Sequence, residues 1–260
     1  MSKPRSICVY CGSDRHITKQ HIIPNRVRRI LPRDSDHYNY RTYTFERTAE
    51  HTQIRFEPRR KPGHLGTRKL RAVCYSCNNG WIREVEEDAF PLVELLVAGA
   101  APVLSPNDVA RLRMLCCTIF TMIDLVDERG TAVSQAERTH IRKTLSPPDT
   151  WQLYLGRADS REWQLRYRHH SAVSLPHGVL PNGEKSNVQV STVVIGKLLL
   201  HVISTQKLPR FIAKPLDYAK MFGIAELGEG REIDVSVLPV LNTDRIEAIA
   251  EKIVSKVIII

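Results

Sequence analysis

The pattern of apolar and polar positions changes once along the chain, at the double proline Pro147-Pro148. Before it, residues 89–145 carry apolar residues at helical spacing. Apolar residues from Val109 to Val126 cover most of one predicted helix, so we expect that helix to be buried at the centre of the protein. Two helix starts are marked, by Ser105 in front of a proline and by the capping box Ser134-Gln-Ala-Glu137.

After the double proline the pattern is typical of β-strands. The predicted strands are 151–155, 163–167, 188–203 and 233–238. Within the third strand, Ser191-Thr192 and Gly196-Lys197 interrupt a long apolar run and predict a bend. We expect His169-His170 at an exposed strand end and a closing helix over Thr243–Lys256. The C-terminal half should therefore be an α+β unit built on an antiparallel sheet.

Shorter elements are predicted in the first third of the chain. Gly12-Ser13-Asp14 is turn chemistry, and Ile17–Ile23 has the pattern of a strand, so we expect a short local hairpin after the first cysteine pair. Residues 37–73 have the composition of an inserted strand pair, in which aromatic residues alternate with Thr and Arg. A helix should open between Asn78 and Asp88.

The composition is that of an ordinary soluble protein. Of 260 residues, 42% are hydrophobic and 25% are charged. No apolar run approaches the length needed to cross a bilayer, and no secretory signal is visible, so we expect a cytoplasmic protein with no membrane partner. Ile253–Ile260 is apolar but short, and is expected to form a buried strand or helix end.

Positive charge is concentrated at the N-terminal end. The net charge is +10, and residues 1–73 hold 17 Lys and Arg against 6 Asp and Glu. Such a distribution predicts a face that binds a polyanion, here nucleic acid, although a solvated basic surface would give the same count. The candidate phosphate contacts are Arg26, Arg28, Arg29, Arg59, Arg60 and Lys61.

Four of the six cysteines form two C-x-x-C pairs, Cys8 with Cys11 and Cys74 with Cys77. In a chain without a secretion signal, this spacing favours a metal site over disulfides or unrelated thiols. Four thiolates at the corners of a tetrahedron are what a structural Zn²⁺ requires. Cys116 and Cys117 lie in the apolar helical run, where we expect them to be small core residues.

Three motifs occur in a characteristic order. They are C-x-x-C-G at Cys8–Gly12, Gln20-His21-Ile22-Ile23-Pro24, and C-x-x-C-N-N-G-W at Cys74–Trp81. Together they resemble the HNH nuclease family, the ββα-metal or His-Me finger endonucleases, over residues 6–88. The resemblance implies a zinc-stapled ββα-metal (HNH) domain within an α+β protein. We therefore expect three units: residues 1–90 as that domain with a basic insertion, 91–148 as a helical segment, and 149–260 as an accessory domain.

The resemblance also implies a chemistry. His21, whose imidazole is neutral near pH 7, would act as general base toward water. Gln20 and Asn78 would bind a catalytic Mg²⁺ or Mn²⁺. The expected substrate is double-stranded DNA, and cutting both strands of a duplex would suit a two-fold homodimer. Cleavage would leave 5′-phosphate and 3′-hydroxyl ends. By analogy with stand-alone HNH proteins, the biological setting would be phage defence or a mobile element.

One position departs from the family pattern. The residue before the histidine is commonly an acid, and here it is the neutral Gln20. Metal affinity should then be weaker, unless a nearby acid such as Glu86 contributes. Two alternatives stay open: a catalytically inactive zinc module that binds nucleic acid through its basic face, and an interaction protein whose C-terminal domain performs the function.

Overall fold

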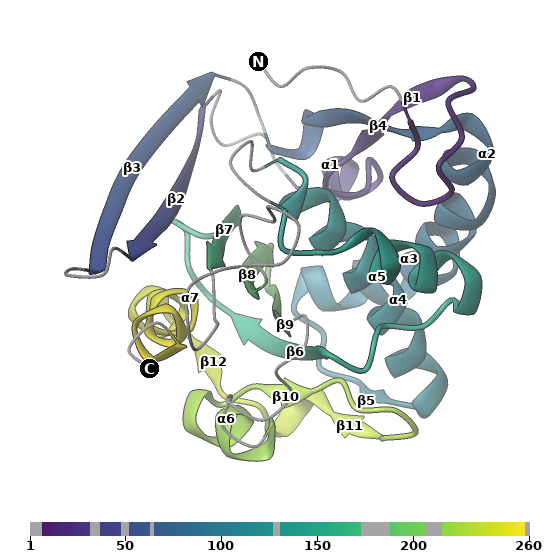
Figure 1. Cartoon of the computed structure of the whole chain (residues 1–260). Helices are drawn as coiled ribbons and strands as arrows, with labels where there is room; N and C mark the ends of the chain where they lie inside the picture. The colour runs from purple at the N-terminus through teal and green to yellow at the C-terminus, as the bar shows by residue number, and fades with distance from the viewer. Residues whose placement is uncertain are drawn as a thin grey trace.

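The structure of the chain is a computed structural model (Figure 1). It describes residues 7–31, 37–47, 52–62, 65–126, 131–172, 188–205 and 215–257. Within these ranges, the side chains at 28, 37–47, 52–62, 172, 205, 215–217 and 252–257 are not described.

A six-stranded sheet forms the centre of the protein, with strand order β10-β6-β9-β8-β7 and β12 beside β6. Its strands are β6 (Trp151–Ala158), β7 (Leu165–Ala172), β8 (Val188–Ile195), β9 (Leu198–Thr205), β10 (Ala225–Glu226) and β12 (Val240–Leu241). Neighbouring strands are antiparallel, except that β12 runs parallel to β6. The predicted α+β class and the antiparallel sheet after the double proline are therefore confirmed.

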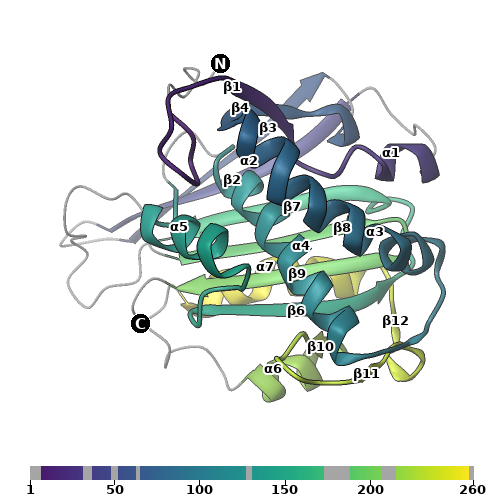
Figure 2. The same cartoon turned by 90° about the vertical axis from the view of Figure 1, so that its right-hand side faces the viewer.

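Helices cover both faces of this sheet (Figure 2). On one face lie α3 (Arg83–Ala98) and α4 (Pro106–Asp124), and on the other lie α6 (Pro215–Phe222) and α7 (Thr243–Val257). All eight residues of β8 are buried as a result. The buried polar residues of this strand are hydrogen-bonded inside the protein: Gln189 Nε2 donates to the carbonyl of Phe120 (3.0 Å), and Ser191 Oγ lies 2.7 Å from His169 Nδ1.

The predicted helix starts are confirmed. The Ser105 hydroxyl accepts the backbone N–H of Asp108, which begins α4. Ser134 and Glu137 form the expected capping box at the start of α5 (Gln135–Thr144). Helix α4 is buried along most of its length, because it lies between α3 and the sheet. Cys116 and Cys117 are core residues of this helix, as predicted.

The N-terminal part has the order strand, strand, helix. Strand β1 (Ile17–His21) pairs antiparallel with β4 (Lys69–Cys74), and the chain continues through α2 (Tyr75–Cys77) and η2 (Asn78–Ile82) into α3. The connection from β1 to β4 contains α1 (Val27–Ile30), the hairpin of β2 (His37–Arg47) and β3 (Thr52–Pro62), and η1 (Leu65–Thr67). The predicted inserted strand pair is confirmed over residues 37–62, whereas residues 69–73, which the prediction included in the insertion, belong to β4.

The predicted local hairpin after the first cysteine pair is wrong. Its turn residues close the cysteine loop instead, because the N–H of Cys8 donates to the carbonyl of Ser13 (2.7 Å) and the N–H of Gly12 donates to that of Cys8 (2.9 Å). Strand β1 is left to pair with β4, which comes much later in the chain.

Two predicted strands differ from the structure by more than a shift of their ends. Residues 188–203 form two strands joined at Gly196-Lys197, where Gly196 has φ of +58°, and Ser191 lies inside β8 without a bend. Residues 233–238 contain only the short β11 (Ile233–Asp234), which pairs with β5 (Val103–Leu104), followed by the 3-10 turn η4 (Val235–Val237). The Asp234 carboxylate accepts the N–H of Ser236, which favours the turn over an extended chain.

The prediction that His169-His170 is exposed is also wrong. The two side chains are 5% and 1% exposed. Helices α4 and α7 both pack against β7, and the part of the strand that holds His169 and His170 is interior on both faces. His169 Nδ1 lies 2.7 Å from Ser191 Oγ, which satisfies part of its hydrogen-bonding capacity inside the protein.

One apolar cluster extends through all three predicted units. It contains Tyr10 and Ile22 from the N-terminal part, Phe120 from α4, and Leu200 from the sheet. None of the described helices combines the length and the apolarity that crossing a bilayer requires.

We predict that buried His201 makes the fold sensitive to acid. Its ring accepts or donates hydrogen bonds at Thr192 Oγ1 (2.8 Å) and Tyr218 OH (3.0 Å), and burial lowers its pKa from 6.5 to about 3. Between these two pH values, His201 is protonated in the unfolded chain and neutral in the folded protein. The contribution of His201 to the free energy of unfolding should be fully present above pH 6.5. It should fall by about 1.4 kcal/mol per pH unit from there down to about pH 3.

Urea unfolding near neutral pH and near pH 5 would measure this contribution. His201→Gln should reduce the pH dependence of the free energy of unfolding, whereas His140→Gln, at an exposed position on α5, should not. Equal pH dependence in both variants would contradict the prediction.

Candidate metal centre and adjoining site

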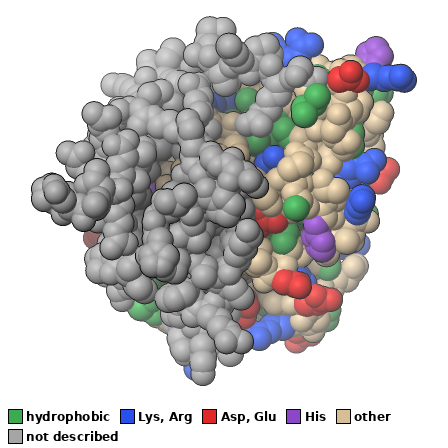
Figure 3. Space-filling view, in the orientation of Figure 1, with side chains coloured by type: hydrophobic (Ala, Val, Ile, Leu, Met, Phe, Trp, Pro, Cys, Tyr) green, Lys and Arg blue, Asp and Glu red, His purple; other side chains and the backbone are tan. Residues whose placement is uncertain are grey.

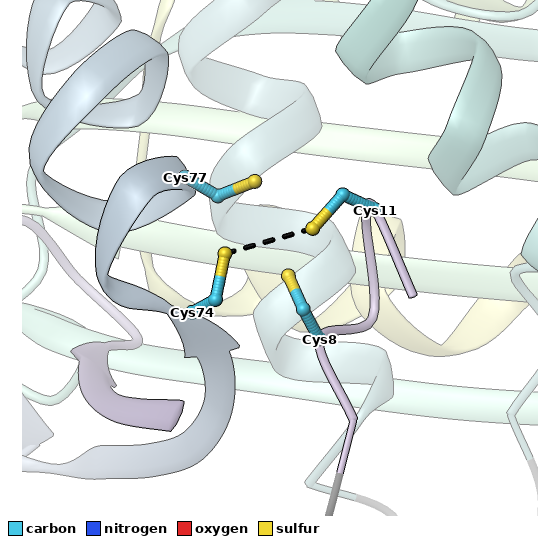
Figure 4. Close-up of side chains that lie close together, drawn as sticks. All are labelled: Cys8, Cys11, Cys74 and Cys77. Atoms are coloured by element: carbon cyan, nitrogen blue, oxygen red, sulfur yellow. Dashed lines mark hydrogen bonds between the residues drawn. The ribbon is translucent and has the colours of Figure 1, made fainter. Parts of the chain in front are cut away.

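The four predicted cysteines form one cluster. The sulfur atoms of Cys8, Cys11, Cys74 and Cys77 all lie within 4.8 Å of one another, and those of Cys11 and Cys74 are 3.6 Å apart (Figure 4). A tetrahedral zinc tetrathiolate has sulfur–sulfur distances of about 3.8 Å. All six cysteines of the chain are free thiols. The cluster can therefore hold a zinc ion.

Local backbone geometry presents these thiols. Gly12 has a φ of +73°, a backbone conformation that residues with a Cβ rarely adopt. This conformation lets the chain turn at the end of the first cysteine loop. Burial alone would raise the pKa of the Cys8 thiol. Its sulfur accepts hydrogen bonds from the backbone N–H groups of Cys74, Cys11 and Tyr10, and these hydrogen bonds lower the pKa to about 7. Burial raises the pKa of Cys77 to about 12. A divalent cation is what would ionise all four thiols near pH 7.

Helix α5 supports the first cysteine loop from the side. The carbonyl of Val9 accepts hydrogen bonds from Gln135 Nε2 (3.0 Å) and Arg138 Nε (3.1 Å). One turn further along α5, the guanidinium of Arg142 lies beside Cys77, which raises the pKa of Arg142. Four thiolates around Zn²⁺ leave two negative charges, and Arg142 is placed to offset part of them.

A β-bulge joins the metal cluster to the strand pair. Thr18 pairs with Val73 and Lys19 pairs with Arg71, so Ala72 is an extra residue on β4. The carbonyl of Ala72 accepts the N–H of Val9 (2.9 Å), in the loop between the first two cysteines. The bulge therefore fixes the first cysteine loop against β4.

Gln20 lies on the face of β1 that packs against α3. Its side chain is only 6% exposed, and its Nε2 donates to Glu86 Oε1 at 2.9 Å. Burial raises the pKa of Glu86 to about 7, although Gln20 and the nearby Arg26 both act to lower it. Phe90 lies one helical turn after Glu86 on α3. The guanidinium of Arg26 lies over the Phe90 ring, 5.3 Å from the ring centre. An amide, a carboxyl and a guanidinium thus converge between β1 and α3.

Asn78 is hydrogen-bonded to Thr18, which lies two residues before Gln20 on the same face of β1. Its Nδ2 donates to Thr18 Oγ1 (2.8 Å), and this hydroxyl donates to the carbonyl of Val73 (2.9 Å). Asn78 begins a π-helical turn that is interrupted at Gly80, a local geometry often found at functional sites. Both Asn78 and Gln20 use their NH₂ groups in these hydrogen bonds, which leaves their oxygens as the atoms for a hard cation.

His21 is the last residue of β1, and it is half-buried opposite Lys69. Successive side chains of a strand leave on opposite faces, so His21 and Gln20 begin on different sides of the β1–β4 ribbon. The structure therefore joins Gln20 to Glu86 and Asn78 to Thr18 by hydrogen bonds, and places His21 directly after Gln20 at the end of β1.

The predicted phosphate contacts are only partly described. Arg26 and Arg29 are exposed, and the side chains of Arg28, Arg59, Arg60 and Lys61 lie outside the described part of the structure. In the view of Figure 3, basic and acidic side chains lie side by side on the described surface.

Comparison of the chain with protein-family models, with curated proteins and with solved structures found no match. The function therefore has to be argued from the residues of this site.

We predict that Cys8 is needed for zinc and Cys116 is not. Both side chains are fully buried, so Cys8→Ala and Cys116→Ala remove a similar amount of packing. Purified wild type and Cys116→Ala should contain stoichiometric zinc by elemental analysis, and Cys8→Ala should lose most of it. Because structural zinc contributes to folding, Cys8→Ala should also show the larger fall in melting temperature. Equal zinc content in the two variants would contradict the assignment.

Proposed function

We propose that the protein is a metal-dependent endonuclease that hydrolyses phosphodiester bonds in DNA. The observation that carries this proposal is the hydrogen bond between Gln20 and Glu86. It puts a carboxylate beside the one position where the sequence departs from the HNH pattern. His21 follows directly on β1, at the edge of the same site.

The donor atoms suit a hard cation. Glu86 offers carboxylate oxygens, and Gln20 and Asn78 offer amide oxygens, which are the ligands that Mg²⁺ and Mn²⁺ take in proteins. A bound divalent ion would polarise the scissile phosphate and neutralise charge on the leaving 3′ oxygen.

The other residues supply proton transfer and charge. The His21 imidazole takes a proton from the attacking water, which then adds to phosphorus in line with the leaving oxygen. The bond to the 3′ oxygen breaks, the leaving 3′ oxygen takes up a proton from solvent water, and the products are a 5′-phosphate and a 3′-hydroxyl. Arg26, exposed and held over Phe90, attracts the phosphate to this end of the site.

The order of elements lends support. Strands β1 and β4 followed by α3 give the strand-strand-helix order that the ββα-metal resemblance implies. The cysteine cluster lies where the two strands meet the start of the helix, and can hold the zinc that the resemblance calls for.

A second function is favoured by one feature of the same site. The NH₂ of Gln20 is already satisfied by Glu86, and a neutral amide in this position suits a module that binds nucleic acid without cutting it. The two functions differ in whether added Mg²⁺ or Mn²⁺ produces cleavage.

We predict that His21→Ala lowers the rate of DNA cleavage by at least about a hundredfold, because general base catalysis contributes at least that much. Zinc content should stay unchanged, because the imidazole is not part of the cysteine cluster. His16→Ala, at an exposed position just before β1, is the matched control and should cut like wild type. The assay is conversion of supercoiled plasmid across titrations of Mg²⁺ and Mn²⁺. Uncut DNA with wild type under all these conditions would support the binding module instead.

We predict that the charge on Glu86 governs metal affinity. Glu86→Gln should weaken Mn²⁺ binding by about tenfold or more, and Gln20→Asp should strengthen it, because a full charge outweighs an amide dipole. Binding can be followed by the electron paramagnetic resonance signal of free Mn²⁺, without any cleavage. Glu84→Gln, at an exposed position on the same helix, is the control. If all three variants bind Mn²⁺ like wild type, Glu86 is no ligand.

A further inference from the structure

The exposed face of the β1–β4 ribbon is lined with basic residues. Lys19 is paired with Arg71, and His21 is paired with Lys69. Lys19, Lys69 and Arg71 are exposed, whereas Gln20, on the other face of β1, is buried against α3. Paired residues of an antiparallel ladder lie on the same face, so these side chains share the face of the proposed general base, His21.

The β-bulge is what brings the basic residues of β4 to this face. In the unshifted register that begins with Thr18 and Val73, Lys19 would lie opposite Ala72, and Arg71 would lie opposite Gln20 on the buried face. The extra residue Ala72 shifts the ladder by one position. A one-residue shift moves every following side chain of the strand to the opposite face. Arg71 and Lys69 therefore share the face of His21.

This arrangement is unfavourable for the protein alone. Like charges directly opposite each other in a sheet repel, and Lys19 faces Arg71 in this way. None of the ion pairs within the described part of the chain involves Lys19, Lys69 or Arg71. A polyanion lying across the ribbon would relieve the repulsion, and a row of phosphates matches a row of cations.

We propose that Lys19, Lys69 and Arg71 bind the phosphate backbone of a nucleic acid and guide the scissile phosphate to His21. The binding part of this inference stands on the ribbon alone, and the guiding part rests on the proposed nuclease function. The sequence did not single out these three residues, because they are scattered between Lys19 and Arg71, and only strand pairing gathers them.

Salt dependence of DNA binding tests the binding part. The double variant Lys19→Gln/Arg71→Gln is compared with Arg161→Gln/Lys220→Gln, which removes the same charge from exposed positions outside the ribbon. Fluorescence anisotropy of a labelled short duplex is measured over a series of salt concentrations with no added Mg²⁺ or Mn²⁺. Zinc content of each variant checks that the cysteine cluster is intact.

Each lost phosphate contact should lower the slope of log affinity against log salt by about 0.9, and the two together should weaken binding by roughly tenfold to a hundredfold at moderate salt. The control variant should lose little affinity and keep the wild-type slope. Equal losses in both double variants, or an unchanged slope in the ribbon variant, would overturn the inference.

Lys69 tests the guiding part. Because it lies opposite His21, Lys69→Gln should lower kcat more than it raises KM, and Lys69→Arg should restore most of the rate. A purely structural role would change stability and zinc content instead.

If the ribbon variant loses binding while wild type cuts no DNA, the phosphate face stands and the nuclease function fails. If wild type cuts and the ribbon variant binds and cuts like it, the phosphate face fails and the nuclease function stands.

Discussion

Everything in the N-terminal part depends on bringing Cys11 and Cys74 together, although 63 positions separate them. Closing so long a loop costs conformational entropy, and a pair of five- and six-residue strands is short for meeting that cost alone. The cysteine cluster can hold a zinc ion, and that ion would supply a further constraint on the loop. The carbonyl of Ala72 and the side chains of α5 then fix the first cysteine loop in one orientation.

The β1–β4 ribbon has two chemically different faces. Toward α3, hydrogen bonds join Gln20 to Glu86 and Thr18 to Asn78, and the site offers oxygen atoms for a cation. Toward solvent, the bulge gathers cations around His21. An enzyme that cuts a polyanion needs both kinds of surface close together, a metal-binding one and a phosphate-binding one. The two faces of this ribbon hold one each, and this is the physical reason that we favour a nuclease over a simple zinc module.

The sequence predicts those features that depend on local chemistry. Two C-x-x-C pairs, a capping box at Ser134 and an apolar helix over α4 need only neighbouring residues, and all three are present in the structure. Features that depend on tertiary contacts were missed. These features are the partner of β1, the bulge at Ala72 and the burial of His169-His170. They depend on which segments pack together, and the local sequence pattern does not determine that packing. Glu86 was only a minor candidate for the same reason, because its distance to Gln20 is set by the packing of α3.

The central claim is that four cysteines from two distant segments hold one zinc ion and thereby assemble the site. X-ray absorption at the zinc edge of the purified protein tests it most directly, because it reports the type and number of ligands around the metal. The account predicts four sulfur ligands at about 2.3 Å. Nitrogen or oxygen ligands in the first shell, or fewer than four sulfurs, would contradict it.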